Sequence, residues 1–339
     1  MKIETKTLKS QLDKVMIAVG ERNSIIEQMG HFIFNDDVIL AYNGQLYCSI
    51  PFDSGLKASV NAQEFYKIIS RTEGEVEITV EENQLKVKGK KVKAGFNLIE
   101  ENEILPIITT VEKQTDMDFL KLPDDFSTGV KLCCISAGKD DQGTLACLKV
   151  EGNRLITCDS MRISVFEMNE KMPDFFVKAT AIREVVRNEI THYNISDSWI
   201  NFLSKDDCVY SVRLVFGNYP DISTVTNSEL QETSLVFPKE IKESVEMVSI
   251  LDEDNKMYVT ISESSILFRV QKEKGWIESD VALKEPSKME AGFIINPFLL
   301  HKLVSSVDKV TIQLSERFLL CSAESFKQYI GLIVNLKEE

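Results

Sequence analysis

The feature that most limits how this chain can fold is an internal repeat. Six segments have apolar residues at helical spacing, and their starts are about 60 residues apart. They begin near Thr5, Asn61, Leu122, Lys178, Pro238 and Asn296. Because spacing of three and four residues predicts amphipathic helices, we expect six helices at nearly regular intervals.

The segments between these helices alternate apolar and polar residues, which predicts strands. Three of them have the same strand-turn-strand-strand pattern, at residues 31–52, 145–168 and 257–281, with turns at 35–37, 151–153 and 263–265. A second set of hairpins is predicted at 75–89, 192–214 and 309–322. The chain therefore contains three copies of a unit of roughly 113 residues, each made of two helix-plus-strands halves.

This repeat predicts an α+β fold in which thin helical layers pack on sheets. We expect three domains, at residues 1–113, 114–235 and 236–339. The boundaries fall near the acidic, proline-containing segment 100–117 and the segment 221–233, which is rich in Ser and Thr.

Composition limits the location and the partners. Met1 is followed by a charged stretch with no apolar signal region, and no apolar run reaches the roughly 18 residues of a membrane helix. The seven cysteines show no CxxC spacing and lie mostly in apolar runs, so we expect reduced thiols and a cytoplasmic protein. The net charge of −14 disfavours nucleic acid unless basic residues are concentrated on one surface.

No arrangement of residues predicts catalysis, a metal site or a cofactor. The three histidines are far apart, and none has a second ligand at metal spacing. Gly138-Lys139 lacks the other residues of a phosphate loop, and residues 252–255 lack the spacing of a calcium loop. Cys158-Asp159-Ser160 has no nucleophile elbow around it, so we expect a protein that is not an enzyme.

Several segments are similar, in order, to one known family. Residues 155–165 match a Thr-Asp-Gly-His-Arg-Leu signature at Asp159, Arg162 and Ile163, with Ser160-Met161 in place of Gly-His. Residues 216–221 are similar to a Gly-x-Phe-Pro-Asp-Tyr turn, and residues 329–336 to a last strand without its usual Met-Pro-Met-Arg ending. Together these segments resemble the bacterial DNA polymerase III beta subunit, the sliding clamp.

The resemblance implies a ring of six similar domains, with helices lining a hole and sheets outside. Three domains in a chain then require a head-to-tail homodimer that encircles duplex DNA without reading its sequence. DNA polymerase and clamp loader would bind through short peptides of the Gln-Leu-x-Leu-Phe type. The six predicted helical segments sum to a charge of +3, which leaves −17 for the rest of the chain and has the sign expected of a DNA-facing lining.

The resemblance also implies three sets of site residues. The DNA-contacting candidates are Lys6, Lys9, Lys14, Arg22, Lys67, Arg71, Lys139, Gln142, Arg183 and Arg187. The candidates for the dimer interface are Phe96, Leu98, Ile250 and Leu251. The candidates for the partner-peptide cleft are Arg162, Ile163, Pro220, Val225, Phe318, Leu320, Ile330, Leu332 and Val334.

Other interpretations remain open at this point. A hydrolase or nucleotide-binding protein would need a pocket with convergent carboxylates or a cofactor. A β-rich repeat scaffold that never binds DNA would not close into a ring. A clamp of a phage or mobile element would keep the fold but serve another polymerase, and the altered Ser160-Met161 pair and C-terminal end are compatible with it.

Overall fold

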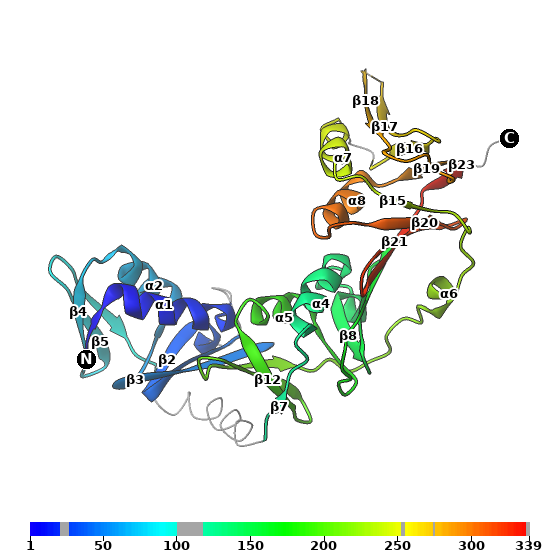
Figure 1. Cartoon of the computed structure of the whole chain (residues 1–339). Helices are drawn as coiled ribbons and strands as arrows, with labels where there is room; N and C mark the ends of the chain where they lie inside the picture. The colour runs from blue at the N-terminus through cyan, green and yellow to red at the C-terminus, as the bar shows by residue number, and fades with distance from the viewer. Residues whose placement is uncertain (21–26, 100–117, 252–254, 274, 337–339) are drawn as a thin grey trace. The chain divides into compact units, whose positions relative to one another are not determined.

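The computed structural model describes residues 1–20, 27–99, 118–251, 255–273 and 275–336 (Figure 1). The chain forms two compact units. Unit 1 comprises Met1–Asp124 with Thr180–Phe216, and unit 2 comprises Asp125–Ala179 with Gly217–Glu339. In each unit the described strands form two antiparallel sheets, with helices packed on them.

Unit 1 contains a four-stranded and a six-stranded sheet. The order of the first is β1 (Lys2–Glu4), β4 (Glu75–Glu81), β5 (Gln84–Lys88), β6 (Lys93–Asn97). The order of the second is β2 (His31–Tyr42), β3 (Leu46–Asn61), β14 (Val209–Arg213), β13 (Trp199–Ser204), β12 (Ile190–Ile195), β7 (Leu120–Lys121). The helices are α1 (Thr5–Val15), α2 (Ala62–Arg71), α5 (Ala179–Val185) and the 3-10 turns η1 (Met16–Ala18) and η2 (Glu27–Gly30).

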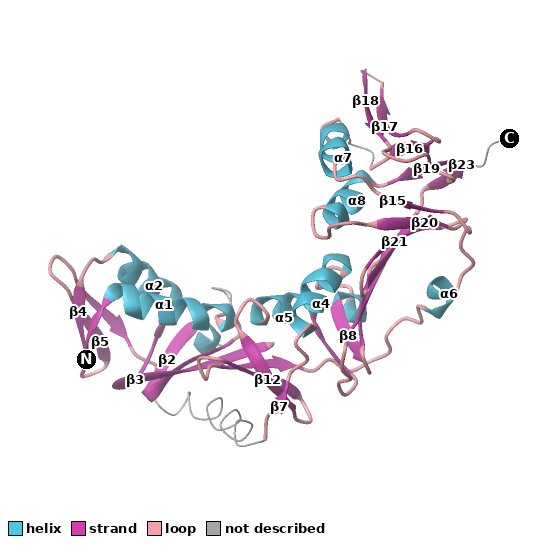
Figure 2. Ribbon diagram, in the orientation of Figure 1, coloured by secondary structure: helices cyan, strands magenta, loops and turns pink. Residues whose placement is uncertain are grey.

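The helices of unit 1 lie on one side of its strands (Figure 2). Helix α1 buries Leu8 and Leu12 at helical spacing, and the side chain of Asn61 caps α2 by accepting a hydrogen bond from Glu64 N at 3.1 Å. Phe65 of α2 meets Phe34 and Phe96 edge to face, at centroid distances of 5.7 and 5.5 Å. This aromatic contact joins the helical layer to both sheets.

Unit 2 contains an eight-stranded and a five-stranded sheet. The order of the first is β11 (Phe175–Lys178), β8 (Cys147–Glu151), β9 (Arg154–Cys158), β10 (Arg162–Glu167), β22 (Phe326–Gly331), β21 (Phe318–Ala323), β20 (Thr311–Leu314), β15 (Ser234–Val236). The order of the second is β18 (Gly275–Ala282), β17 (Ser265–Lys272), β16 (Met257–Ile261), β19 (Ala291–Ile295), β23 (Val334–Leu336). The helices are α4 (Phe126–Cys133), α6 (Ser223–Thr226), α7 (Ile241–Ser249), α8 (Pro297–Val304) and the 3-10 turns η3 (Cys134–Ser136) and η4 (Gly143–Ala146).

The predicted elements agree with the observed ones, with one error at a turn. Helices α1, α2, α4, α5, α7 and α8 begin within four residues of the six predicted starts. The turn predicted at 35–37 is wrong, because β2 continues through a bulge next to Asp36. The chain reverses at Asn43-Gly44 instead, where the Asn43 side chain accepts hydrogen bonds from Gln45 N and Leu46 N and Gly44 has φ +90°.

Sheets cross the boundaries between the predicted domains. Strand β3 of the first repeat pairs with β14 of the second, and β10 of the second pairs with β22 of the third. For this reason the two compact units divide the chain differently from the three repeats. All seven cysteines are buried and free, and no described helix is long and apolar enough to cross a membrane.

Gly129 provides a test of the packing between α4 and the eight-stranded sheet. A Cβ atom there would lie 2.5 Å from Phe166 Cδ1 and 2.6 Å from Leu155 Cδ1. We expect Gly129→Ala to destabilise the protein by about 1–2 kcal/mol, because overpacking outweighs the gain in helix propensity. Urea unfolding measures this, with Gly30→Ala as control because no atom lies within 4 Å of the added Cβ. If both variants are equally stable, α4 does not pack against Phe166 and Leu155 as closely as described.

Candidate functional site

The outer face of the eight-stranded sheet carries an apolar patch, defined here by its ten residues. Five are buried in the sheet: Ile156, Val165, Phe318, Leu320 and Tyr329. Five half-buried side chains pack against them: Ile163, Tyr219, Ile222, Val225 and Leu230. These side chains share one face because Ile163 and Leu320 both pair with Tyr329 across neighbouring strands.

The segment after unit 1 crosses this patch and is fixed at both ends. The Tyr219 hydroxyl is 3.4 Å from the carbonyl oxygen of Cys147 and 3.3 Å from that of Ile156, and the Gln231 amide donates to Leu314 O at 2.8 Å. Burial raises the pKa of Tyr219, so its hydroxyl stays neutral and can donate. The segment thereby holds Ile222, Val225 and Leu230 beside the strands.

A groove of about 540 Å³ continues the patch at the turn between β20 and β21. Leu230 and Phe318 belong to both the patch and the groove. The remaining lining is polar: Ser228, Glu229, Gln231, Ser315, Glu316 and Arg317. A groove of this size that continues an apolar patch suits a short peptide segment.

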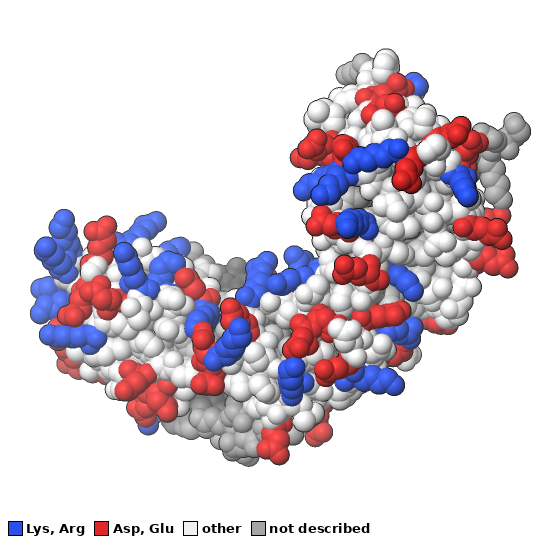
Figure 3. Space-filling view, in the orientation of Figure 1, with Lys and Arg blue, Asp and Glu red and all other residues white. Residues whose placement is uncertain are grey.

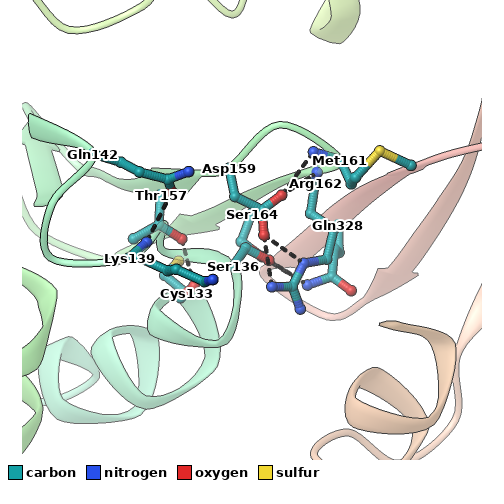
Figure 4. Close-up of polar contacts among 10 residues, drawn as sticks. All are labelled: Cys133, Ser136, Lys139, Gln142, Thr157, Asp159, Met161, Arg162, Ser164 and Gln328. Atoms are coloured by element: carbon teal, nitrogen blue, oxygen red, sulfur yellow. Dashed lines mark hydrogen bonds and ion pairs between the residues drawn. The ribbon is translucent and has the colours of Figure 1, made fainter. Parts of the chain in front are cut away.

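The turn from β9 to β10 positions the strand that carries Ile163. The Asp159 carboxylate accepts hydrogen bonds from Met161 N at 2.8 Å and Arg162 N at 2.7 Å (Figure 4). It also accepts from Arg162 Nε at 3.1 Å and Nη2 at 2.7 Å. Arg162 is only 7% exposed, so this ion pair fixes the turn from inside and leaves Met161 exposed at its tip.

Beneath the patch, a buried polar network links the second and third repeats. The Gln328 amide nitrogen donates to Ser136 Oγ at 2.7 Å and to Ser164 Oγ at 3.0 Å (Figure 4). The two hydroxyls are 2.7 Å apart. Since Ser164 and Gln328 are opposite each other in the β10–β22 pair, the network specifies the register of these two strands.

The predicted cleft residues separate into three groups. Ile163, Val225, Phe318 and Leu320 belong to the patch, while exposed Pro220 and half-buried Leu332 flank it in the chain. Arg162 and Ile330 are paired with each other and alternate to the opposite face of the sheet from Ile163 and Tyr329. Val334 lies on β23 and pairs with Ile294 in the other sheet.

Sequence reasoning missed six patch residues. Tyr219 and Ile222 are within two residues of Pro220, which was predicted. Side chains alternate between the two faces of a strand, so Ile156, Val165 and Tyr329 could have been assigned to the face that Ile163 and Leu320 share. Leu230 had no sequence signal, because its place depends on how segment 217–231 crosses the sheet.

The DNA-contacting candidates lie mainly on the helical layer of unit 1, where basic side chains gather over α1, α2 and α5 (Figure 3). Lys6, Lys67, Arg71 and Arg183 are exposed, and no ion pair to them is found in the part of the chain that the structure describes. Three others are paired: Lys9 with Asp13 at 2.9 Å, Lys14 with Asp206 at 2.9 Å, and Arg187 with Glu184 at 2.5 Å. The hydrogen bond to Asp13 raises the pKa of Lys9.

The remaining DNA-contacting candidates differ from this group. Lys139 is exposed on a loop of unit 2, and its amide donates to Gln142 Oε1 at 2.9 Å (Figure 4). The Gln142 side chain thus holds the loop, and a Cβ on Gly138 would lie 2.5 Å from Gln142 Oε1, so this side chain would have to shift to accept one. Arg22 lies outside the described residues.

The candidates for the dimer interface differ in exposure. Ile250, at the end of α7, is 73% exposed, and Leu251 is half-buried. Phe96 on β6 is buried against Phe65, and Leu98 after it is half-buried. Met247 of α7, 53% exposed, was not predicted and lies one turn before Ile250.

The described residues contain no group of three or more His, Cys, Asp or Glu side chains that could hold a metal ion. Burial raises the pKa of Cys133 and Cys158, so neither thiol is activated as a thiolate.

No family model and no curated protein sequence matches the chain. Solved structures match it over nearly its whole length. The sliding clamp of Pseudomonas aeruginosa bound to griselimycin has a TM-score of 0.83 at 15% identity, covering 98% of each chain. The DNA polymerase sliding clamp of Bacillus subtilis has a TM-score of 0.79 at 16% identity, covering 98% of each chain. The Helicobacter pylori beta clamp bound to a DNA ligase peptide has a TM-score of 0.77 at 13% identity, covering 98% of this chain and 99% of that one.

These similarities give the chain the fold of bacterial sliding clamps. They confirm the predicted α+β class and the resemblance in fold.

Asp159 tests whether the turn beside the patch depends on its ion pair. Asp159→Ala leaves the buried Arg162 guanidinium without a carboxylate, and we expect a loss of about 3 kcal/mol in the free energy of unfolding. Asp124→Ala is the control: its ion pair with Lys121 is more than 60% exposed on both sides, and its removal should leave stability unchanged. Urea unfolding compares the two variants. If Asp159→Ala leaves the free energy of unfolding unchanged, the turn does not depend on the ion pair.

Proposed function

We propose that this protein is a DNA sliding clamp that tethers a polymerase to duplex DNA and catalyses no reaction. Two copies would close head to tail into a ring, and the ring would act in the cytoplasm. The observation that carries this proposal is the match of the whole chain, over 98% of both partners, to structures named as sliding clamps.

The repeat supports a dimer. Three domains at 1–113, 114–235 and 236–339 contain three pairs of helices, and two chains would supply six similar domains. A closed ring needs an unpaired edge at each end of the chain. Within the described residues, β6 in the first repeat and β18 in the third each pair on one side only, and Ile250 is exposed on α7 of the third.

The basic helical layer of unit 1 supports contact with DNA. Lys6, Lys67, Arg71 and Arg183 extend from helices as exposed cations, and their contacts with phosphates would not depend on the base sequence. Such contacts exchange easily along the duplex, and the closed ring would prevent escape.

The apolar patch supports docking of partner peptides. A similar fold is solved as a Helicobacter pylori beta clamp bound to a DNA ligase peptide. Here the patch and its groove would take a short segment of DNA polymerase or clamp loader, with two or three apolar side chains inserted. An interface of that size gives dissociation constants on the order of a micromolar, so partners could exchange.

The first test concerns the phosphates. Lys67→Ala with Arg183→Ala removes two cations without an ion pair among the described residues, and we expect the salt slope of DNA binding to fall by roughly 0.9 for each phosphate that is no longer neutralised. Lys14→Ala with Arg187→Ala is matched in residue types, but carboxylates already compensate these charges, so the slope should change less. Fluorescence anisotropy with duplex DNA at several salt concentrations measures both, and equal slopes would reject this DNA-facing surface.

The second test concerns the patch. Ile163→Asp with Val225→Asp places two carboxylates among apolar side chains, and we expect at least about 30-fold weaker binding of a Gln-Leu-x-Leu-Phe peptide. Val236→Asp is the matched control, since this valine is 58% exposed on β15 and lies outside the patch.

Isothermal titration gives the affinities. Because Ser160-Met161 stands in place of the Gly-His pair of the signature that the chain resembles, we expect the wild type to bind this peptide weakly but measurably. If the double variant binds as tightly as the control, the peptide site is elsewhere.

A further inference from the structure

A small cavity in unit 2 is lined by residues 237–242, where α7 begins, and by residues 304–310, where α8 ends. The Phe237 amide donates to the Val310 carbonyl oxygen at 2.8 Å and joins these two stretches of chain. The cavity has a volume of about 140 Å³ and opens to solvent. None of its lining residues belongs to the apolar patch or to the groove beside it, so the cavity is a separate feature of unit 2.

The cavity has the size and the lining for one apolar side chain. Phe237, Ile241 and Val310 are buried, and Val304 and Val307 are half-buried. An apolar cavity of about 150 Å³ can stay free of water and bind benzene. The side chain of a Phe or a Leu would therefore fill this cavity, whereas the larger indole of a Trp would not fit without displacing its walls.

Three lysines also line the cavity. Lys239, Lys242 and Lys309 are exposed, and no ion pair to any of them is found within the described ranges of the chain. Asp308 is the one carboxylate among the described lining residues. Three cations and one anion make this site positive on a chain whose net charge is −14, so it would attract an acidic ligand.

We propose that this cavity, with Lys239, Lys242 and Lys309, binds an acidic peptide segment of a partner protein in which a Phe or Leu is flanked by Asp or Glu. The apolar side chain enters the cavity, and the carboxylates beside it lie near the lysines. Exposed ion pairs contribute little by themselves, so the apolar side chain supplies most of the affinity and the lysines select an acidic sequence. The site shares no residue with the patch, and the inference goes beyond the function proposed above.

The apolar lining favours a peptide over DNA as the ligand. Phosphates of DNA would neutralise the lysines, but a phosphodiester backbone has no apolar group for the cavity, and the bases of a duplex are stacked inside it. A peptide satisfies both features, because an apolar side chain can stand next to charged ones. A partner with this segment and a patch-binding segment could bind both sites of one unit, and the link between them would raise its apparent affinity.

Short peptides test the proposal on the wild-type protein. The probe is acetyl-Asp-Glu-Phe-Glu-Asp-amide, and its counterparts have Leu, Ala or Trp in place of Phe. We expect the Phe and Leu peptides to bind at least about tenfold more tightly than the Ala and Trp peptides, because only Phe and Leu fill the cavity. Isothermal titration at low salt measures the affinities. If the Ala peptide binds as tightly as the Phe peptide, the cavity takes no side chain and the inference is overturned.

Two variants separate the cavity from the charges. Lys239→Ala with Lys242→Ala should weaken binding of the Phe peptide about tenfold and reduce its salt dependence, while the preference for Phe over Ala remains. Val307→Phe fills the cavity with the protein's own side chain, so this preference should be lost while the salt dependence remains. If Val307→Phe does not fold, the comparison of the Phe and Trp peptides on the wild type still decides whether the cavity limits the size of the side chain.

The matched control for the lysines is Lys284→Ala with Lys288→Ala. Both residues are exposed in unit 2 and lie outside the cavity, so the variant removes the same charge and should bind the Phe peptide as the wild type does. If the two double variants weaken binding equally, the peptide responds to overall charge and not to this site.

Two further ligands distinguish this site from those proposed above. An excess of the Gln-Leu-x-Leu-Phe peptide should leave binding of the acidic Phe peptide unchanged, and full displacement would place the acidic peptide in the patch. Duplex DNA should bind the Lys239→Ala, Lys242→Ala variant as it binds the wild type. A loss of DNA affinity with unchanged peptide binding would assign these lysines to phosphates. A protein that binds the Gln-Leu-x-Leu-Phe peptide but not the acidic one keeps the proposed function and lacks only this site.

Discussion

Strand pairing across the repeat boundaries is the interaction on which the rest of this structure depends. The β3–β14 pair joins the first two repeats in one sheet, and the β10–β22 pair joins the last two. Backbone hydrogen bonds are satisfied only when both strands are present, so a single repeat would leave an open edge. The same kind of strand pairing between two copies would close a ring.

The β10–β22 junction also produces the candidate peptide site. Alternation along these strands places Ile163, Val165 and Tyr329 on the outer face, and Ser164 and Gln328 on the inner face. The inner polar network fixes the register, and the outer apolar side chains become one surface as a result. A register error of one residue would move the apolar side chains inward and expose the polar ones.

The sequence allowed the six helices, most strands and the α+β class to be predicted, because periodicity is local. It could not predict that Arg162 is buried with Asp159, because the burial of this part of β10 depends on its pairing with β22, more than 160 residues away. The bulge at Asp36 was missed because Asn-Asp-Asp also suits a turn, and only the longer pairing with β3 decides between them. The sequence did not predict that Trp276 is exposed, because only the sheet order shows that β18 is an edge strand.

Retention on circular DNA tests the central claim most directly. Subunits dissociated at high dilution are allowed to reassociate with nicked circular duplex DNA, and free protein is removed by gel filtration at a salt concentration that abolishes binding to linear duplex. A topologically closed ring predicts that protein stays with the circles and leaves within minutes after a restriction enzyme linearises them. Equal lifetimes on circular and linear DNA would contradict the ring.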